Sequence, residues 1–331
     1  MKLTLRSLDE QVMVITGASS GIGRATALLA ARRGAAVVLT ARSAEELAEV
    51  VAEIHRGQGR ATFHGADVTE PKQLQEVVAL ALREYGRIDT WVNVAGISAY
   101  GRLDQLELED MQRVMDVTFW GVVHGTRAAL PHLREGGGAL INIGSELSSI
   151  AVPLQGPYVA AKHAVAGFTD VLRMELEKER APVSVTLIRP GSIDTPFFQH
   201  ALSATAHDPL PPPPVYAPEL VAEAILHCAA HPRRDLVVGG GARAMIGLSH
   251  WAPRLARRLF EGTLFRSQQG GELTRDAEGA LYWPSGPSAV RGGYAGRKLS
   301  LYTRVQLHPW SSVFAILLLG AGVAAVARKA R

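Results

Sequence analysis

Short apolar runs alternate with longer amphipathic segments over the first 240 residues of the chain. The runs are rich in Val, Ile, Leu and Ala and lack polar alternation, which is typical of strands buried on both faces of a sheet. The segments between them repeat apolar residues every three or four positions, which predicts helices. Together they predict a doubly wound parallel sheet with helices on both faces, an α/β fold. About seven strands are expected, at residues 11–16, 36–40, 61–65, 88–94, 139–145, 183–188 and 236–238.

Glycine or polar residues stand where several of these expected strands end. They are Gly17, Arg42, Asp67, Asn93 and Ser145. The carboxyl ends of parallel strands meet at one edge of a sheet, and ligands bind there at the switch in strand order. The sequence therefore predicts one ligand site, built from these five positions.

The first strand is followed by Gly-Ala-Ser-Ser-Gly-Ile-Gly and then by a helical pattern. A glycine-rich turn alone is weak evidence, but a turn between a strand and a helix is the context of a dinucleotide-binding fingerprint. Glycines let the backbone approach a pyrophosphate, and the helix N-terminus offers unpaired N–H groups and a positive dipole end. The residues predicted to bind the cofactor here are Gly17, Ser19, Ser20, Gly21, Ile22 and Gly23.

The second strand ends in Ala-Arg42-Ser43, at the position that meets the adenosine ribose. An acidic residue there would bind the 2′-hydroxyl of NAD(H), whereas an arginine suits the 2′-phosphate of NADP(H). A guanidinium–phosphate contact contributes about 1.5–3 kcal/mol, so the sequence predicts NADP(H) over NAD(H). The alternative is a solvated arginine at a strand end. Asp67 is expected to accept a hydrogen bond from the adenine amino group, or else simply to flank a helix.

The segment from Ser145 to Lys162 carries the candidate acid–base chemistry. Tyr158 and Lys162 are four residues apart and share a face if the segment is helical. An ammonium held near a phenol favours the phenolate, lowers the phenol pKa from about 10 and makes proton transfer feasible near neutral pH. Ser145 could then hydrogen-bond the oxygen that gains or loses the proton. Taken without the glycine turn, a Tyr-x-x-x-Lys pair would be a surface feature of a helix.

Composition and charge narrow the class of protein. The net charge is only +4, but the basic residues concentrate in the last quarter of the chain. No nucleic-acid-binding motif accompanies them, so no nucleic-acid partner is predicted, and an anionic lipid surface fits better. The single cysteine, Cys228, excludes an intramolecular disulfide and suits a reducing, cytoplasmic compartment. The N-terminus lacks the apolar core of a signal peptide, and no metal site is predicted.

These motifs, taken together, resemble the classical short-chain dehydrogenase/reductases across residues 8–240. The matching segments are Thr-Gly-Ala-Ser-Ser-Gly-Ile-Gly, Asn93-Val-Ala-Gly, Tyr-Val-Ala-Ala-Lys and Arg-Pro-Gly-Ser-Ile-Asp-Thr at residues 189–195, with Asp67 and Ser145. The resemblance implies a Rossmann-type fold and hydride transfer between nicotinamide and a carbonyl or alcohol. It implies that Tyr158 is the proton donor and acceptor, that Lys162 holds the nicotinamide ribose and that Ser145 polarises the substrate oxygen. The further cofactor positions it implies are Val68, Asn93, Ala95, Gly96, Pro190, Gly191, Ile193 and Thr195.

The chain departs from the family pattern in two places. Valine occupies position 94, where the family usually has a second asparagine. On the long helix, Val117-Thr118 replaces the usual Val-Asn pair, whose asparagine is the fourth catalytic member and anchors a water in a proton relay. Thr118 is the candidate substitute, and we expect activity to survive at a reduced rate.

Beyond residue 240 the resemblance ends, and three regions are expected: a catalytic domain at 1–240, an extension at 241–308 and a final segment at 309–331. Residues 242–265 predict a basic amphipathic helix, either lying in a membrane interface or packed on the domain. Residues 309–327 carry no charge and would span roughly 28 Å as a helix. This favours a C-terminal membrane helix, with a buried core helix as the alternative. Residues 268–297 are Gly-rich and polar, and no structure is predicted for them.

The sequence thus predicts an NADP(H)-dependent oxidoreductase acting on a small, apolar carbonyl or secondary alcohol. The alternative is a non-catalytic NADP(H)-binding scaffold or sensor at a membrane. The catalytic domain is expected to be cytoplasmic, with membrane association through the C-terminal segment. Family resemblance suggests a homodimer or homotetramer formed through helices 111–133 and 157–180. The Pro-rich residues 197–218 are expected to be a substrate lid or a plain linker.

Overall fold

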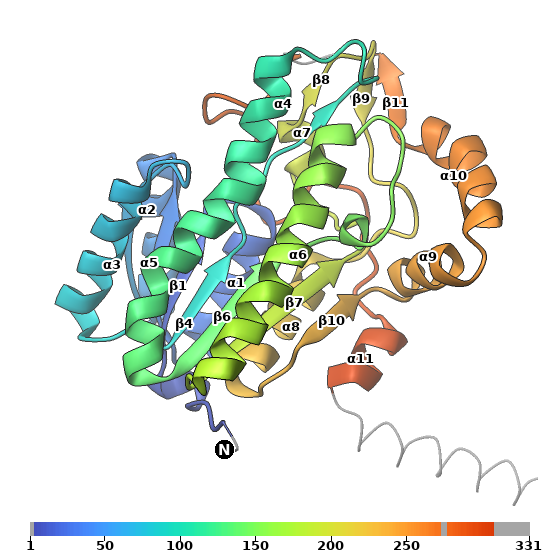
Figure 1. Ribbon diagram of the computed structural model, residues 1–331. Helices are drawn as coiled ribbons and strands as arrows, with labels where there is room; N and C mark the ends of the chain where they lie inside the picture. The colour runs from blue at the N-terminus through green and yellow to red at the C-terminus, as the bar shows by residue number, and fades with distance from the viewer. Residues whose placement is uncertain (1–2, 273–276, 308–331) are drawn as a thin grey trace, which may run out of the picture.

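The seven predicted strands form one parallel sheet. The computed structural model describes residues 3–272 and 277–307. The strand order is β10-β7-β6-β4-β1-β2-β3, and every neighbouring pair is parallel (Figure 1). The Rossmann-type prediction is confirmed. The strands are β1 (Val12–Thr16), β2 (Ala36–Ala41), β3 (Arg60–Gly65), β4 (Thr90–Asn93), β6 (Gly138–Ile143), β7 (Val183–Pro190) and β10 (Asp235–Val238).

Helices cover both faces of the sheet, because its strands are apolar on both sides. One face carries α1 (Gly21–Arg32), α2 (Ala44–Arg56) and α8 (Pro218–Ala230). The other face carries α3 (Pro71–Tyr85), α4 (Leu108–Met115), α5 (Gly121–Gly136) and α6 (Gly156–Glu179), with α4 and α5 joined by a π-helical turn at Asp116–Trp120.

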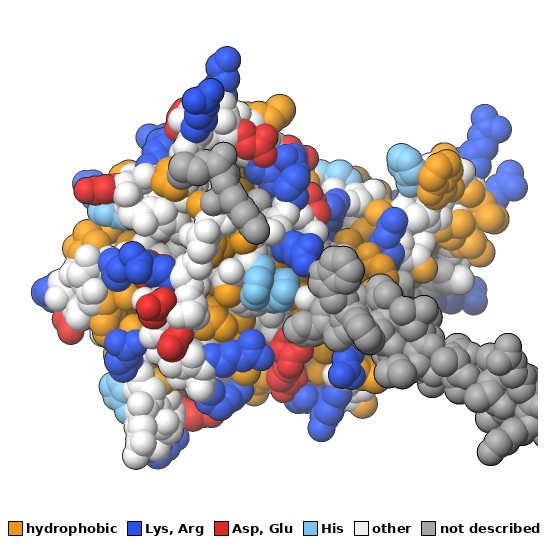
Figure 2. Space-filling view, turned by 90° about the horizontal axis from the view of Figure 1, so that it is seen from below, with side chains coloured by type: hydrophobic (Ala, Val, Ile, Leu, Met, Phe, Trp, Pro, Cys, Tyr) orange, Lys and Arg blue, Asp and Glu red, His pale blue; other side chains and the backbone are white. Residues whose placement is uncertain are grey.

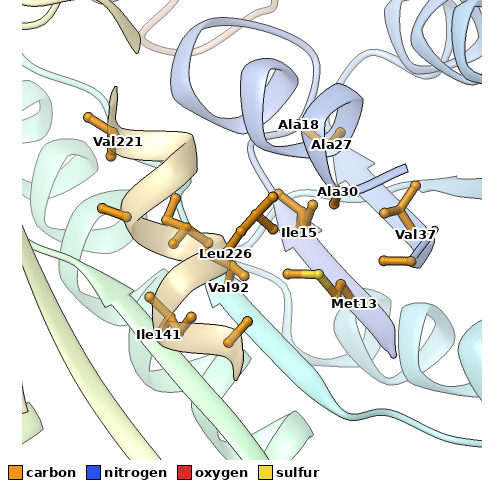
Figure 3. Close-up of a cluster of buried hydrophobic side chains, with 14 of the residues drawn as sticks. Met13, Ile15, Ala18, Ala27, Ala30, Val37, Val92, Ile141, Val221 and Leu226 are labelled. Carbon is orange, nitrogen blue, oxygen red and sulfur yellow. The ribbon is translucent and has the colours of Figure 1, made fainter. Parts of the chain in front are cut away.

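The central strand β1 divides its side chains between two hydrophobic clusters. Met13 and Ile15 point into the cluster under α1 and α8, which Figure 3 shows. Val12 and Val14 point into the cluster under α3, α5 and α6. This follows from the two-residue period of a strand, which sends successive side chains to opposite faces. All five residues of β1 are buried, so the strand that leads into the glycine turn is held rigidly.

The strand order switches direction at β1. From β1 the chain runs outward to β2 and β3, and then crosses to β4 on the opposite side of β1. The connections after β1 and β4 therefore diverge and leave a crevice at the carboxyl edge of the sheet, where α/β folds bind ligands.

Two small two-stranded sheets lie outside this frame. β5 (Ala99–Tyr100) pairs with β8 (Leu202–Ser203), and β9 (His207–Pro209) pairs with β11 (Gln269–Glu272). The sequence shows none of these strands, because two to four residues are too few to establish a period. The expected lid at residues 197–218 thus contains a helical turn, α7 (Phe197–His200), and two short strands.

The extension folds against the domain as three helices, α9 (Gly240–Trp251), α10 (Pro253–Ser267) and α11 (Leu301–Leu307). The single helix expected over residues 242–265 is interrupted at Ala252, because the residue before a proline disfavours helical geometry. Ala256, Phe260 and Leu264 of α10 are buried in a cluster with η3 (Glu146–Ser148), a turn of 3-10 helix. The inner face of α10 therefore packs on the domain.

Within residues 3–272 and 277–307, no helix is long and apolar enough to cross a membrane. The membrane helix expected at residues 309–327 lies outside the described residues. On the face seen in Figure 2, Lys and Arg side chains are interspersed with Asp and Glu. They form no continuous basic stripe on that face.

Candidate active site

A groove runs along the carboxyl edge of the sheet, through the turns that follow β1, β2, β4, β6 and β7. Most of the residues predicted from the sequence line it. They are Gly17, Ser19, Ser20, Gly21, Ile22, Gly23, Arg42, Ser43, Asp67, Val68, Ala95, Gly96, Ser145, Tyr158, Lys162, Pro190, Gly191, Ile193 and Thr195. Asn93 and Thr118 lie beneath its surface.

The glycine turn fits closely between its neighbours. Gly17 and Gly21 have φ values of 64° and 52°, in the left-handed region that other residues rarely adopt. A Cβ atom on Gly17 would stand 2.9 Å from the backbone of Ala95, and one on Gly21 would stand 3.1 Å from Cβ of Thr195. The glycines therefore let the turns after β1, β4 and β7 meet around the first turn of α1. This narrow backbone cradle suits a pyrophosphate.

Asn93 supports the site from below. Its side-chain amide donates to Asn142 Oδ1 over 2.8 Å, and its carbonyl oxygen accepts from Trp91 Nε1, also over 2.8 Å. The side chain is 2% exposed. In this arrangement Asn93 ties β4 to β6 and presents no atom to the groove.

The three predicted catalytic side chains converge. Ser145 follows β6, and Tyr158 and Lys162 stand one turn apart on α6. The Ser145 side chain is a neighbour of the Tyr158 hydroxyl and lowers the pKa of that phenol. The Lys162 amine lies 5.5 Å from the centre of the Tyr158 ring and donates to the carbonyl oxygen of Ile143 over 2.7 Å. A substrate oxygen placed beside Tyr158 would therefore meet two hydroxyl groups.

Burial opposes the pKa shift that the sequence predicted. Desolvation raises the pKa of Tyr158 above its usual value, the Ser145 hydrogen bond lowers it, and the Glu146 carboxylate raises it further. The ammonium of Lys162 is itself desolvated, which lowers its pKa from 10.5 to about 7. In this structure the lysine does not make Tyr158 acidic, because the same burial disfavours both charges. The sequence-based expectation of a lowered Tyr158 pKa is therefore wrong.

Thr118 is buried within the π-helical turn. Its hydroxyl donates to the carbonyl oxygen of Ile97 over 3.0 Å and accepts from the Ile97 N–H over 3.1 Å. The side chain is completely buried. Its Oγ1 atom and the Lys162 amine both lie close to Gly96, because a Cβ atom on that glycine would stand 3.7 Å from the first and 3.8 Å from the second. Since its one proton is donated to Ile97, the Thr118 hydroxyl holds the loop after β4 in place.

Two arginines lie near the turns that follow β2 and β3, Arg42 on the groove and Arg113 beside Asp67. Arg113 Nη2 lies 2.7 Å from Asp67 Oδ2, and the Thr69 N–H and hydroxyl donate to Asp67 Oδ1. Burial raises the pKa of Asp67, but the hydrogen bonds from Arg113 and Thr69 outweigh it and keep that pKa below its usual value. Arg42 donates to three backbone carbonyls, those of Ala280, Leu281 and Tyr282. Asp67 is thus already held by Arg113, and Arg42 by the C-terminal extension.

The groove also has apolar walls that the sequence did not reveal. Val152 and Phe197 lie there with Leu147, Met245 and Leu264, and Phe197 packs against the Tyr158 ring at 5.3 Å. Gln155 and Gln268 add one polar pair, joined by a 2.5 Å hydrogen bond. Met245 and Leu264 come from α9 and α10, so the extension forms part of this wall. No local pattern marks them, since their role depends on contacts between distant segments.

Glu146 is a second ionisable group that the sequence did not single out. It follows Ser145, lines the groove and is 7% exposed. Burial raises its pKa from 4.5 to about 7. A carboxyl group whose pKa is raised by folding destabilises the protein as pH rises between these two values.

We therefore expect Glu146→Gln to gain stability relative to the parent protein between pH 4.5 and 7. The difference of about 2.5 pKa units corresponds to at most about 3 kcal/mol. Urea unfolding at pH 4.5, 6 and 8 measures this gain. Glu223→Gln, at an exposed site on α8, should follow the parent at every pH. A pH-independent difference for Glu146→Gln would contradict the assigned shift.

Comparison with known proteins agrees with the family resemblance seen in the sequence motifs. The short chain dehydrogenase family pattern matches residues 11–206. The uncharacterised oxidoreductase YxnA of Bacillus subtilis is 43% identical over 330 residues, covering 98% of this chain and 93% of the relative. Its similarity therefore includes the C-terminal extension.

Two solved structures share the fold. One is an alcohol dehydrogenase of the archaeon Thermococcus sibiricus complexed with 5-hydroxy-NADP, with a TM-score of 0.61 and 29% identity over 69% of this chain and 95% of that chain. The other is a short chain dehydrogenase of Mycobacterium paratuberculosis bound to NAD, with a TM-score of 0.64 and 26% identity over 72% of this chain and 100% of that chain. With the family pattern and the YxnA relative, they show that the chain is an oxidoreductase of the short-chain dehydrogenase family.

Proposed function

We propose that the protein is an NADP(H)-dependent oxidoreductase that interconverts a carbonyl and a secondary alcohol on a small, apolar molecule. The observation that carries this proposal is that Tyr158, Ser145 and Lys162 line one groove together with Arg42 and with apolar side chains such as Phe197 and Leu264. The arginine suits a phosphorylated adenosine, and the apolar walls suit the substrate.

The groove residues fit a nicotinamide dinucleotide. The cradle of Gly17, Gly21 and Thr195 would hold its pyrophosphate, and the Lys162 amine would meet the nicotinamide ribose. When bound, the nicotinamide supplies or accepts the hydride. During reduction Tyr158 donates its hydroxyl proton to the substrate oxygen, while Ser145 hydrogen-bonds the same oxygen as its negative charge develops. The Tyr158 proton is then replaced from solvent, and the reverse steps oxidise an alcohol.

The preference for NADP(H) rests on Arg42. It lines the groove at the end of β2, where an acidic residue would be needed to hold the 2′-hydroxyl of NAD(H). Of the two solved structures, one was complexed with an NADP derivative and the other was bound to NAD, so the comparison favours neither cofactor. The proposed preference for NADP(H) therefore depends on Arg42 of this chain.

We expect Arg42→Asp to shift the ratio of kcat/KM for NADPH and NADH about ten- to a hundredfold toward NADH. The aspartate removes the positive charge and offers an acceptor for the 2′-hydroxyl. Because Arg42 also holds three carbonyls of the extension, Tyr282→Phe is the control. This control removes the hydrogen bond from Tyr282 of the extension to Asp110 and leaves the charge at position 42 unchanged. An unchanged ratio in Arg42→Asp would remove the 2′-phosphate argument.

A second candidate is an NADP(H)-binding scaffold without turnover. The observation in its favour is Thr118, whose hydroxyl is bonded to Ile97 and cannot replace the relay asparagine of the family pattern. Following NADPH absorbance with ketones and aldehydes of increasing hydrocarbon length separates the two. Turnover above the rate without substrate would exclude the scaffold.

We further propose that the chain forms a homodimer or homotetramer through the face of α5 and α6. Trp120, in the π-helical turn that leads into α5, is 46% exposed, and Val171 and Met174 of α6 are 50% and 58% exposed. Large exposed apolar side chains on a helix pair suit a subunit interface. Light scattering should give two or four times the mass of one chain, and a monomer would contradict the proposal.

A further inference from the structure

One segment of the extension crosses the outer side of the cofactor groove. We call residues 280–296 the C-terminal belt, which is coloured orange-red to red in Figure 1. Ala280 lines the groove together with Pro284 and Ser285 of the same segment. The belt is therefore a wall of the groove rather than a remote tail, although it has almost no regular secondary structure.

The first anchor of the belt lies at the adenosine end. Arg42 donates to the carbonyl oxygens of Ala280, Leu281 and Tyr282 over 2.6, 3.2 and 2.8 Å. The Tyr282 hydroxyl donates to Asp110 Oδ1 over 2.7 Å. Leu281 is completely buried in the cluster beneath α3 and α5. The hydrogen bonds made by the charged side chains of Arg42 and Asp110, together with the burial of Leu281, hold this end of the belt in place.

The second anchor lies over the glycine turn. The Gly21 N–H donates to the carbonyl oxygen of Ala289 over 2.8 Å, so the belt uses one of the unpaired N–H groups at the start of α1. The Ser288 hydroxyl donates to the Ser19 carbonyl over 3.1 Å. Arg24 of α1 donates to the Ser288 carbonyl over 2.5 Å. These contacts hold the belt directly above the predicted pyrophosphate position.

The third anchor is a buried carboxylate at the nicotinamide end. Asp194, which is 2% exposed, accepts hydrogen bonds from the N–H groups of Gly292, Tyr294 and Gly296 over 3.1, 2.8 and 3.1 Å. A Cβ on Gly292 would overlap the carbonyl oxygen of Thr195. The belt therefore lies against the turn after β7, where bulkier residues would not fit.

We propose that the C-terminal belt is the outer wall of the cofactor site and that the dinucleotide enters and leaves only when the belt releases. This inference rests on the proposed function, because the three anchors lie along the length of a dinucleotide bound in the groove. Bound cofactor is then enclosed between the sheet edge and the belt. Opening of the belt sets the rate of both association and dissociation.

The test is the kinetics of cofactor binding to the double variant Tyr282→Phe, Ser288→Ala. It removes the hydroxyl bonds to Asp110 and Ser19 without changing any charge. Loss of a hydrogen bond to a carboxylate corresponds to about a tenfold change in an opening equilibrium. We expect the association and dissociation rate constants of NADPH to rise together by about tenfold or more, while Kd changes less than threefold. Stopped-flow fluorescence, with an excess of NADP⁺ as the chase, measures both.

Tyr85→Phe is the matched control, since Tyr85 ends α3 at the opposite edge of the sheet from the groove. Its rate constants should equal those of the parent. Unchanged rate constants in the double variant, or faster dissociation with unchanged association, would contradict the proposal that the belt must release before the cofactor can enter or leave. If thermal unfolding shows that the double variant is not folded, Ser288→Ala alone is measured against the same criteria.

The same measurements with NADH keep the two proposals distinct. They need no substrate and no turnover, so they do not depend on Tyr158 or on the choice of nucleotide. If the parent binds neither nucleotide, the proposed function fails and the gate fails with it. If the parent binds one of them and the double variant exchanges it at the parental rates, only the gate is wrong.

Discussion

Tyr158→Phe is expected to lower kcat for carbonyl reduction about 10²- to 10⁴-fold, the usual contribution of a positioned acid–base group. The phenylalanine ring keeps the packing against Phe197 and removes only the hydroxyl group of Tyr158. The Kd for NADPH should change less than threefold, because the lost hydroxyl serves the substrate oxygen. Steady-state kinetics and NADPH fluorescence titration measure the two quantities.

Tyr100→Phe is the matched control for this variant. Tyr100 is a second buried phenol close to Tyr158, but it does not line the groove. Its loss should change kcat less than threefold. Unchanged turnover in Tyr158→Phe would remove the assigned acid, and equal losses in both variants would indicate a general disturbance of this wall.

Lys162→Met is expected to raise the Kd for NADPH and to lower kcat/KM at least about a hundredfold, since the ammonium would hold and orient the nicotinamide ribose. Burial lowers the pKa of this lysine to about 7, so its positive charge is lost as pH rises through 7. The parent should therefore bind NADPH more weakly at pH 9 than at pH 6. Fluorescence titration should show a smaller pH dependence in the methionine variant.

The same variant should be more stable than the parent near neutral pH. A lysine whose pKa is lowered from 10.5 to about 7 destabilises the folded state fully below pH 7, and this cost fades as pH rises toward 10.5. The gain is at most about 5 kcal/mol at pH 7 and shrinks above it. Lys178→Met, at an exposed site on the same helix, should show neither effect. A gain that does not shrink between pH 7 and 10 would contradict the assigned pKa.

Three buried ionisable groups of the groove lower the stability of the folded protein. Lys162, Glu146 and Tyr158 are ionisable side chains brought into one desolvated wall, and burial disfavours the charged form of each. Their burial destabilises the folded state and places the pKa values of Glu146 and Lys162 at about 7. Perturbed pKa values of this kind are typical of functional sites.

The sequence by itself determined the frame and the positions of the chemistry. The succession of strands and helices along the chain, the glycine turn and the one-turn separation of Tyr158 and Lys162 depend on residues close together in the chain. Their periods and motifs therefore encode them directly. The family assignment followed from those motifs and is confirmed.

Only the tertiary structure decided how those positions interact. It brought Ile97 to the Thr118 hydroxyl, Arg113 to Asp67, and the carbonyls of residues 280–282 to Arg42, across separations of 21 to 240 residues. It also reversed the expected pKa shift of Tyr158, because the degree of desolvation depends on every segment packed around the phenol. Contacts of this kind result from the packing of the whole chain, and no local period records them.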